Sequence, residues 1–186
     1  MVYYFNRSTA LASLLLLSAC QSTPALHKME FPQTTVGLAV SSLAVETHTA
    51  SVEDASAAWL DVPMTRQVEQ WFRARYKSGE GLQKGTISVR KASFLETAAS
   101  KQFREQYEMV LELRLEVGDD ITLAKQYASA RVQRSTPFLL NVTPAERSQA
   151  IQRLINETVV DADKELVRSI RSFIPAIITS QGSLTR

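Results

Sequence analysis

The most regular pattern in this chain is YEMVLELRLEV, at residues 107–117. All six odd-numbered positions carry apolar side chains, and four of the five even-numbered positions carry charges. These four are Glu108, Glu112, Arg114 and Glu116. Successive side chains of a strand point to opposite faces, so the alternation predicts a strand with one buried face and one solvated face.

A return strand follows this stretch in the sequence. Gly118-Asp119-Asp120 is a typical turn, and residues 123–134 then alternate with small side chains on the inner side. Ala128, Ala130 and Val132 occupy those inner positions and leave room for a helix to pack closely. Residues 104–134 are therefore predicted to form an antiparallel hairpin.

Two further segments upstream have strand character with a change of phase. Residues 86–96 alternate up to Val89 and resume one position later. Residues 36–45 alternate up to Val40 and then shift in the same way. Both segments are predicted to be strands, and the shift within residues 36–45 indicates a bulge or a bend.

Two amphipathic segments predict helices. The first begins near Asp61 with Pro63 in its first turn, and Gly79 and Gly81 end it. Its inner positions are Met64, Val68, Trp71, Phe72 and Arg75.

The second helix begins at a capping box, Thr143-Pro144-Ala145-Glu146, with proline at the first helical position. Apolar positions at helical spacing then continue for nearly 30 residues, to just before Pro175. They are Ile151, Leu154, Ile155, Thr158, Val159, Ala162, Leu166, Ile170 and Phe173.

These elements follow the order β-α-β-β-β-α and predict an α+β fold. One mostly antiparallel sheet would bury its apolar face under two helices, as a two-layer sandwich. The 186 residues, 45% of them hydrophobic and 22% charged, suit one globular domain, which we expect over residues 36–174. Residues 20–35 are expected to be a flexible tether and residues 175–186 a loose C-terminal tail.

The N-terminus has the features of a bacterial export signal. Arg7 precedes an apolar run at residues 10–17, which is about half the roughly 20 residues that a spanning helix needs. Next comes Leu17-Ser18-Ala19-Cys20, which resembles the lipobox of bacterial lipoproteins. Residues 1–19 are therefore predicted to be a signal peptide, and Cys20, the single cysteine of the chain, is predicted to carry lipid.

The lipoprotein resemblance implies how the protein is processed and where in the cell it is located. It implies cleavage before Cys20, a diacylglycerol on its thiol and an acyl chain such as palmitate on its new amino group. Two or more acyl chains hold a protein stably on a bilayer, whereas one does not. Gln21 stands where an Asp would retain the protein in the inner membrane, so the resemblance implies the periplasmic face of the outer membrane.

Few residues suggest chemistry. His27 and His48 fall in the tether and near a strand end, and no group of His, Cys or acidic residues has metal-ligand spacing. Gly79-Glu80-Gly81 and Gly85 follow a helix, whereas a phosphate-binding loop follows a strand and opens a helix. We therefore expect no enzyme, no metal and no cofactor beyond the lipid on Cys20.

The charged residues suggest neither catalysis nor nucleic-acid binding. Glu112 and Glu116 alternate with Arg114 and indicate a solvated strand face more than an acid–base pair. The net charge of +2 offers no excess of basic residues for nucleic acid.

Two functions from different classes fit these expectations. Lipobox, tether and element order resemble the outer-membrane lipopolysaccharide-assembly lipoproteins and, equally, the auxiliary lipoproteins of lipid-transporting ABC systems. The first hypothesis is an envelope assembly or interaction factor that docks on an envelope protein partner. The alternative is a module that binds lipid or lipopolysaccharide in an apolar pocket. Aromatic side chains could line that pocket or fill the core: Trp59, Trp71, Phe72, Phe94, Tyr107 and Phe173.

Overall fold

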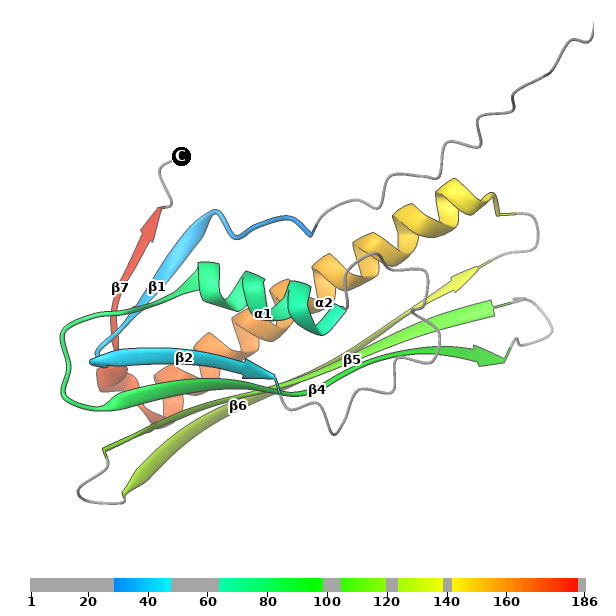
Figure 1. The fold of residues 1–186 in the computed structure, drawn as a ribbon. Coiled ribbons are helices and arrows are strands. Elements are labelled where there is room, and N and C mark those ends of the chain that lie inside the picture. The colour runs from blue at the N-terminus through cyan, green and yellow to red at the C-terminus, as the bar shows by residue number, and fades with distance from the viewer. Residues whose placement is uncertain (1–28, 48–63, 99–104, 120–123, 139–141, 184–186) are drawn as a thin grey trace, which may run out of the picture.

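A computed structural model describes residues 29–47, 64–98, 105–119, 124–138 and 142–183 (Figure 1). The fold is α+β, as predicted. Its helices are α1 (Met64–Arg75), α2 (Pro144–Phe173) and the short 3₁₀ helix η2 (Pro175–Ile177). Its strands are β1 (Thr34–Leu38), β2 (Ser42–Thr47), β3 (Tyr76–Ser78), β4 (Lys84–Ala98), β5 (Glu105–Gly118), β6 (Lys125–Phe138) and β7 (Ile178–Ser183).

The predicted hairpin is confirmed and forms half of the larger sheet. Strands β5 and β6 pair antiparallel along their whole length, from Glu105 opposite Phe138 to Gly118 opposite Lys125. All six odd-numbered apolar side chains of residues 107–117 are buried, as the alternation predicted. Val110 is buried as well, although it lies on the opposite face of the strand.

The phase change in β4 is a β-bulge. Its pairing with β5 is regular up to Val89 and resumes at Lys91, so that Arg90 is the extra residue. The inserted residue returns Ala92 to the inner face, where it is buried together with Ile87 and Val89.

The segment predicted as one bent strand forms two strands in two different sheets. The Val40 amide donates a hydrogen bond to the Leu38 carbonyl at 2.8 Å, which turns the chain sharply at Ala39. Strand β1 lies in a three-stranded sheet of order β3-β1-β7, and β2 joins a four-stranded sheet of order β2-β4-β5-β6. Alternation reports which face of a strand is buried but not which strand lies beside it.

Both sheets are mixed, with antiparallel pairs in the majority as predicted, but the expectation of a single sheet is wrong because the strands divide into two sheets. Strand β2 runs parallel to β4, and β1 runs parallel to β3, whereas the β4–β5, β5–β6 and β1–β7 pairs are antiparallel. The smaller sheet lies at the left end of the molecule in Figure 1.

Gly81 marks a close contact between the links of the two sheets. A Cβ atom at this position would stand 2.1 Å from the carbonyl oxygen of Ala39, a distance that no side chain can accept. The glycine is therefore needed for backbone packing between the β1–β2 and β3–β4 links, which agrees with the structural interpretation of Gly79-Glu80-Gly81.

Both helices lie on the same side of the four-stranded sheet (Figure 1), so the predicted two-layer arrangement is confirmed. Helix α1 packs on β2 and β4, and α2 packs on β5 and β6. The capping box at the start of α2 is present: the Thr143 hydroxyl accepts from the Glu146 amide, and the Glu146 carboxylate accepts from the Thr143 amide. Within the described ranges, no helix is both long enough and apolar enough to cross a membrane.

Both ends of the domain are more ordered than their composition predicted. The C-terminal segment is not a loose tail, because β7 pairs with β1 and Ile177 is buried. The expected tether is docked from Met29 onward: this side chain is buried, and Trp71 Nε1 donates to the Glu30 carbonyl at 2.8 Å. Only a few apolar residues attach each segment to the domain. So few positions show little periodicity in the sequence.

Phe173, predicted on the inner face of α2, is instead 73% exposed. It is the last residue of the helix, which ends just before η2 turns the chain toward β7. Ile174 and Ile177 fill the core at this end in its place, and both are buried.

Candidate functional site

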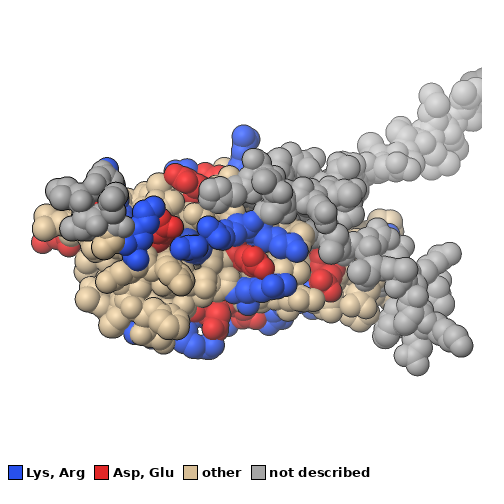
Figure 2. Space-filling model, turned by 90° about the horizontal axis from the view of Figure 1, so that it is seen from below, with Lys and Arg blue, Asp and Glu red and all other residues tan. Residues whose placement is uncertain are grey.

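The face of the four-stranded sheet away from the helices is polar and open. Figure 2 views the molecule from below and shows Lys and Arg side chains interspersed with Asp and Glu side chains on this side. The even-numbered side chains of β5 and the odd-numbered side chains of β6 lie here, in register across the hairpin. We call it the outer face, defined by Arg90, Glu112, Arg114, Glu116, Lys125, Tyr127, Ser129 and Arg131.

A shallow depression of about 270 Å³ lies in the middle of the outer face. Its side chains come from three adjacent strands: Arg90 from β4, Glu112 and Arg114 from β5, and Tyr127, Ser129 and Arg131 from β6. Sheet register explains why they meet, because Arg114 pairs with Ser88 and Ser129, and Glu112 pairs with Arg131.

Arg114 occupies the centre of this depression. Its guanidinium carbon stands 4.4 Å from the ring centroid of Tyr127, in a cation–π contact. Its Nε is buried and has no hydrogen-bond partner. Its nearest carboxylate, Glu116, is 3.8 Å away, which is an ion-pair distance but too long for a hydrogen bond.

The two acids of this face are each paired with cations across the hairpin. Glu112 lies 3.2 Å from Arg131, and Glu116 lies 2.5 Å from Lys125. The hydrogen bond from Lys125 lowers the pKa of Glu116. Burial opposes this effect, and the charges of Lys125, Arg114 and Arg90 add to the lowering. This arrangement agrees with the prediction of a solvated, charged strand face.

The contact between the sheet and α2 is solid where the central residues meet. Leu111 and Leu115 of β5 and Val159 and Leu166 of α2 have an exposed fraction of 0%. A side chain lining a space large enough for a water molecule would retain some accessible surface, so these four line none. The aromatic residues Trp71, Phe72 and Tyr107 are buried in the same core, as the core-packing interpretation required.

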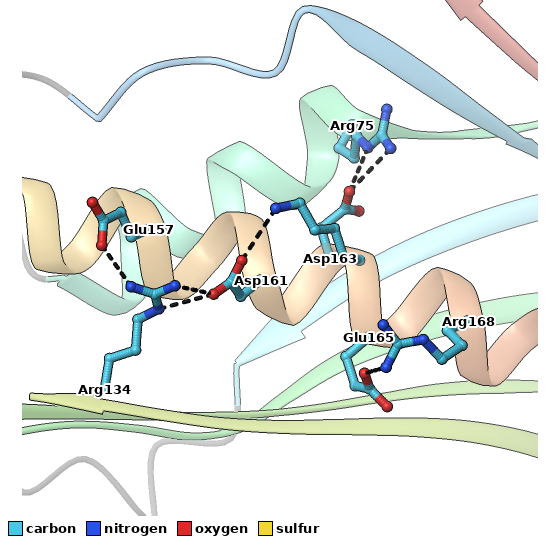
Figure 3. A network of polar contacts seen from close by, with 8 residues as sticks. Arg75, Arg134, Glu157, Asp161, Asp163, Glu165 and Arg168 are labelled. Atoms are coloured by element: carbon cyan, nitrogen blue, oxygen red, sulfur yellow. Dashed lines mark hydrogen bonds and ion pairs between the residues drawn. The ribbon is translucent and has the colours of Figure 1, made fainter.

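An ion-pair network ties the edge strand β6 to α2 (Figure 3). Arg134 donates through Nε to Asp161 at 2.8 Å and through Nη1 to Glu157 at 2.6 Å. Partial burial raises the pKa of Asp161, but hydrogen bonds and charge attraction from Arg134 and Lys164 together lower it below its ordinary value of 3.8. The network therefore favours the ionised carboxylate in the folded state.

This lowered pKa predicts a pH-dependent contribution to stability. A carboxyl group whose folded pKa is below its unfolded pKa stabilises the fold above the unfolded value and stops doing so as the pH falls through the folded value. We expect Arg134→Gln to lower the urea midpoint at pH 7 and to differ progressively less from the wild type between about pH 5 and pH 2. A difference that stays constant over this range would contradict the assignment.

A second polar network is buried between α1, α2 and β1. Asp163 of α2 accepts hydrogen bonds from the Tyr76 hydroxyl at 2.7 Å and from Arg75 Nε at 3.0 Å. Arg75 also donates to the Thr34 carbonyl at 2.8 Å. Burial first, and then the charge of Asp163, raise the pKa of Tyr76 far above its ordinary value, so the phenol remains a donor. This network holds the two helices and the smaller sheet in register.

The structure leaves several predicted residues untested. Cys20, His27, His48 and Trp59 lie outside the described residues, as does the side chain of Phe94. Within the described ranges, no group of three or more His, Cys, Asp or Glu residues could hold a metal ion. The depression on the outer face was missed. The sequence feature that could have indicated it is Arg114, within the most regular strand. Arg90 and Arg131 lie beside Arg114 only because of the strand register.

Comparisons with known proteins gave structural similarity alone. No family model matches the chain, and no curated protein sequence matches it either. Rare lipoprotein B from Shewanella oneidensis is similar in structure with a TM-score of 0.42 and 16% identity, over 70% of this chain and 94% of that one. A minor lipoprotein from Acinetobacter baumannii has a TM-score of 0.38 and 10% identity, over 77% and 98%. A putative neuraminyllactose-binding hemagglutinin homolog from Helicobacter pylori has a TM-score of 0.36 and 9% identity, over 76% and 94%.

Proposed function

We propose that this chain is a periplasmic lipoprotein, anchored through Cys20 to the outer membrane, that acts as a non-enzymatic assembly or interaction factor for an envelope protein. The observation that carries the proposal is the contrast between the two faces of the four-stranded sheet. Its inner face is filled by helices without internal space at the α2 contact, whereas its outer face is broad, polar and accessible.

This contrast favours a docking protein over a module that encloses a lipid. A lipid-binding module needs an apolar cavity for acyl chains. The central side chains between β5 and α2 have no accessible surface, so acyl chains could enter there only by displacing the core. A partner can approach the outer face without any rearrangement of the fold.

The short link to the proposed anchor limits where the partner can be. Met29 is buried against the domain, and nine residue steps separate it from Cys20. A fully extended chain spans at most about 3.3–3.6 Å per residue, so these steps reach at most about 32 Å. The domain would therefore work close to the membrane surface, on a partner that is itself membrane-bound or membrane-proximal.

Substitution of Cys20 tests the anchor. We expect the wild-type protein, expressed in a Gram-negative host, to gain the mass of a diacylglycerol and a further acyl chain and to sediment with the outer membrane. The Cys20→Ala variant should gain no lipid mass and remain in the soluble fraction. Intact-mass spectrometry and membrane fractionation measure both properties, and Ser18→Thr serves as a control with an altered signal region and an intact thiol.

Two results would contradict the proposal at different levels. Equal solubility of the wild type and Cys20→Ala would remove the anchor. Lipidation with sedimentation in the inner membrane would retain the anchor and overturn the outer-membrane location.

A further inference from the structure

We propose that the depression on the outer face binds a carboxylate-bearing, acidic segment of the protein partner, with Arg114 as its central contact. This inference rests on the proposed function, since it names the partner's chemistry. It rests on three features of the depression: its charge, the looser pairing of Arg114 with the acids of the domain, and the polarity of its side chains.

The charge of the depression is positive although acids lie within it. Its lining holds Arg90, Arg114 and Arg131 against Glu112 alone, which is a net charge of 3 − 1 = +2. Including the neighbouring pair of Lys125 and Glu116 leaves this balance unchanged. The whole chain also carries +2, so the depression gathers on a small area as much excess charge as the entire protein has.

Glu112 and Glu116 lie closer to Arg131 and Lys125 than to the central Arg114. Glu112 approaches Arg131 to 3.2 Å and Glu116 approaches Lys125 to 2.5 Å, whereas Arg114 has a carboxylate only at 3.8 Å. Its Nε is buried, so a ligand would meet the terminal nitrogens of the guanidinium, and the Arg114 side chain is 28% exposed. The planar guanidinium suits a carboxylate, which can accept two of its donors at once.

The polarity of the lining favours an acidic peptide over an amphiphile. Leu113 and Ala130 border the depression, but their exposed fractions are 1% and 5%, so they offer almost no apolar surface. The accessible groups are the guanidinium groups, the Glu112 carboxylate, the Ser129 hydroxyl and the exposed side chain of Tyr127. The guanidinium groups and the two hydroxyls can donate to carboxylate or peptide oxygens. The ring of Tyr127, whose side chain is 58% exposed, is the main apolar surface of the lining, and one ring cannot enclose an acyl chain.

A labelled acidic peptide tests the site directly. The probe is fluorescein-labelled hexa-aspartate, and the protein is the full lipoprotein in a neutral detergent at low salt. We expect fluorescence anisotropy to show binding that is at least about tenfold weaker for the R114Q/R131Q double variant, because two charge-assisted contacts are lost. The R153Q/R168Q variant removes the same charge from exposed positions on α2 and should bind as the wild type does.

Each alternative outcome overturns the inference. Equal weakening by both double variants would indicate attraction to net charge alone. Tighter, arginine-dependent binding of inorganic phosphate or of phosphatidylglycerol vesicles would assign the depression to phosphate. The single variant R131Q is the control for misfolding of the double variant, because the Arg131 side chain is 64% exposed. We expect it to weaken peptide binding by at least about threefold.

Photo-crosslinking in cells separates this inference from the proposed function. A crosslinking amino acid at Tyr127 should capture an envelope protein, and one at Arg153 on α2 should not. Crosslinking of an envelope protein only from position 153 would support the proposed function and contradict the proposed site. Absence of capture from both positions, together with absence of peptide binding, would overturn the site and the proposed function alike.

Discussion

The Asp163→Ala variant is expected to be less stable than the wild type by about 3–5 kcal/mol, because the substitution leaves a buried charge without its partner. The side chains of Arg75 and Asp163 are only 12% and 8% exposed, so water cannot replace the lost carboxylate. The Tyr76 hydroxyl loses its acceptor in the same step. Urea unfolding followed by circular dichroism measures the difference.

Tyr76→Phe is the matched control for this network. It removes one donor and leaves the ion pair in place, so we expect a loss of only about 1 kcal/mol. Should Asp163→Ala cost no more than Tyr76→Phe, the ion pair would contribute nothing to holding α1 and β1 against α2.

Leu111→Ala is expected to destabilise the domain by about 2–5 kcal/mol. Leu111 has an exposed fraction of 0% and belongs to the core between the sheet and the helices. Its truncation removes apolar burial and leaves a cavity that the surrounding side chains fill only in part. The free energy of unfolding in urea is the measurement.

The adjacent residue provides the control for this prediction. Glu112 lies on the outer face of the same strand and pairs with the exposed Arg131, so Glu112→Ala should cost at most about 1 kcal/mol. Comparable losses from the two substitutions would contradict the assignment of inner and outer faces to β5.

Local signals in the sequence were reliable where one element carried enough of them. Alternation over eleven positions placed every inner residue of β5, and the capping box placed the first turn of α2. The bulge found after Val89 lies where the alternation of residues 86–96 changes phase. In each case the deciding interaction lies within a strand or a single helical turn, so neighbouring residues are sufficient to specify it.

Predictions failed where a segment depends on a distant partner. The change of phase after Val40 gave no sign that β1 pairs with β7, more than 130 positions further along the chain. Strand β7 is short and polar, and it exists because β1 offers it an edge. Phe173 matched the helical spacing, yet its position at the end of α2 leaves it exposed.

The amino-acid sequence by itself determined the α+β class, the two amphipathic helices, the hairpin and the inner and outer faces of β5. Tertiary structure alone decided the division into two mixed sheets, the docking of Met29, and the meeting of Arg90, Arg114 and Arg131 in one depression. The physical reason is the range of the interactions. Hydrophobic periodicity and capping act over a few residues, whereas strand pairing and register join segments that local sequence does not connect.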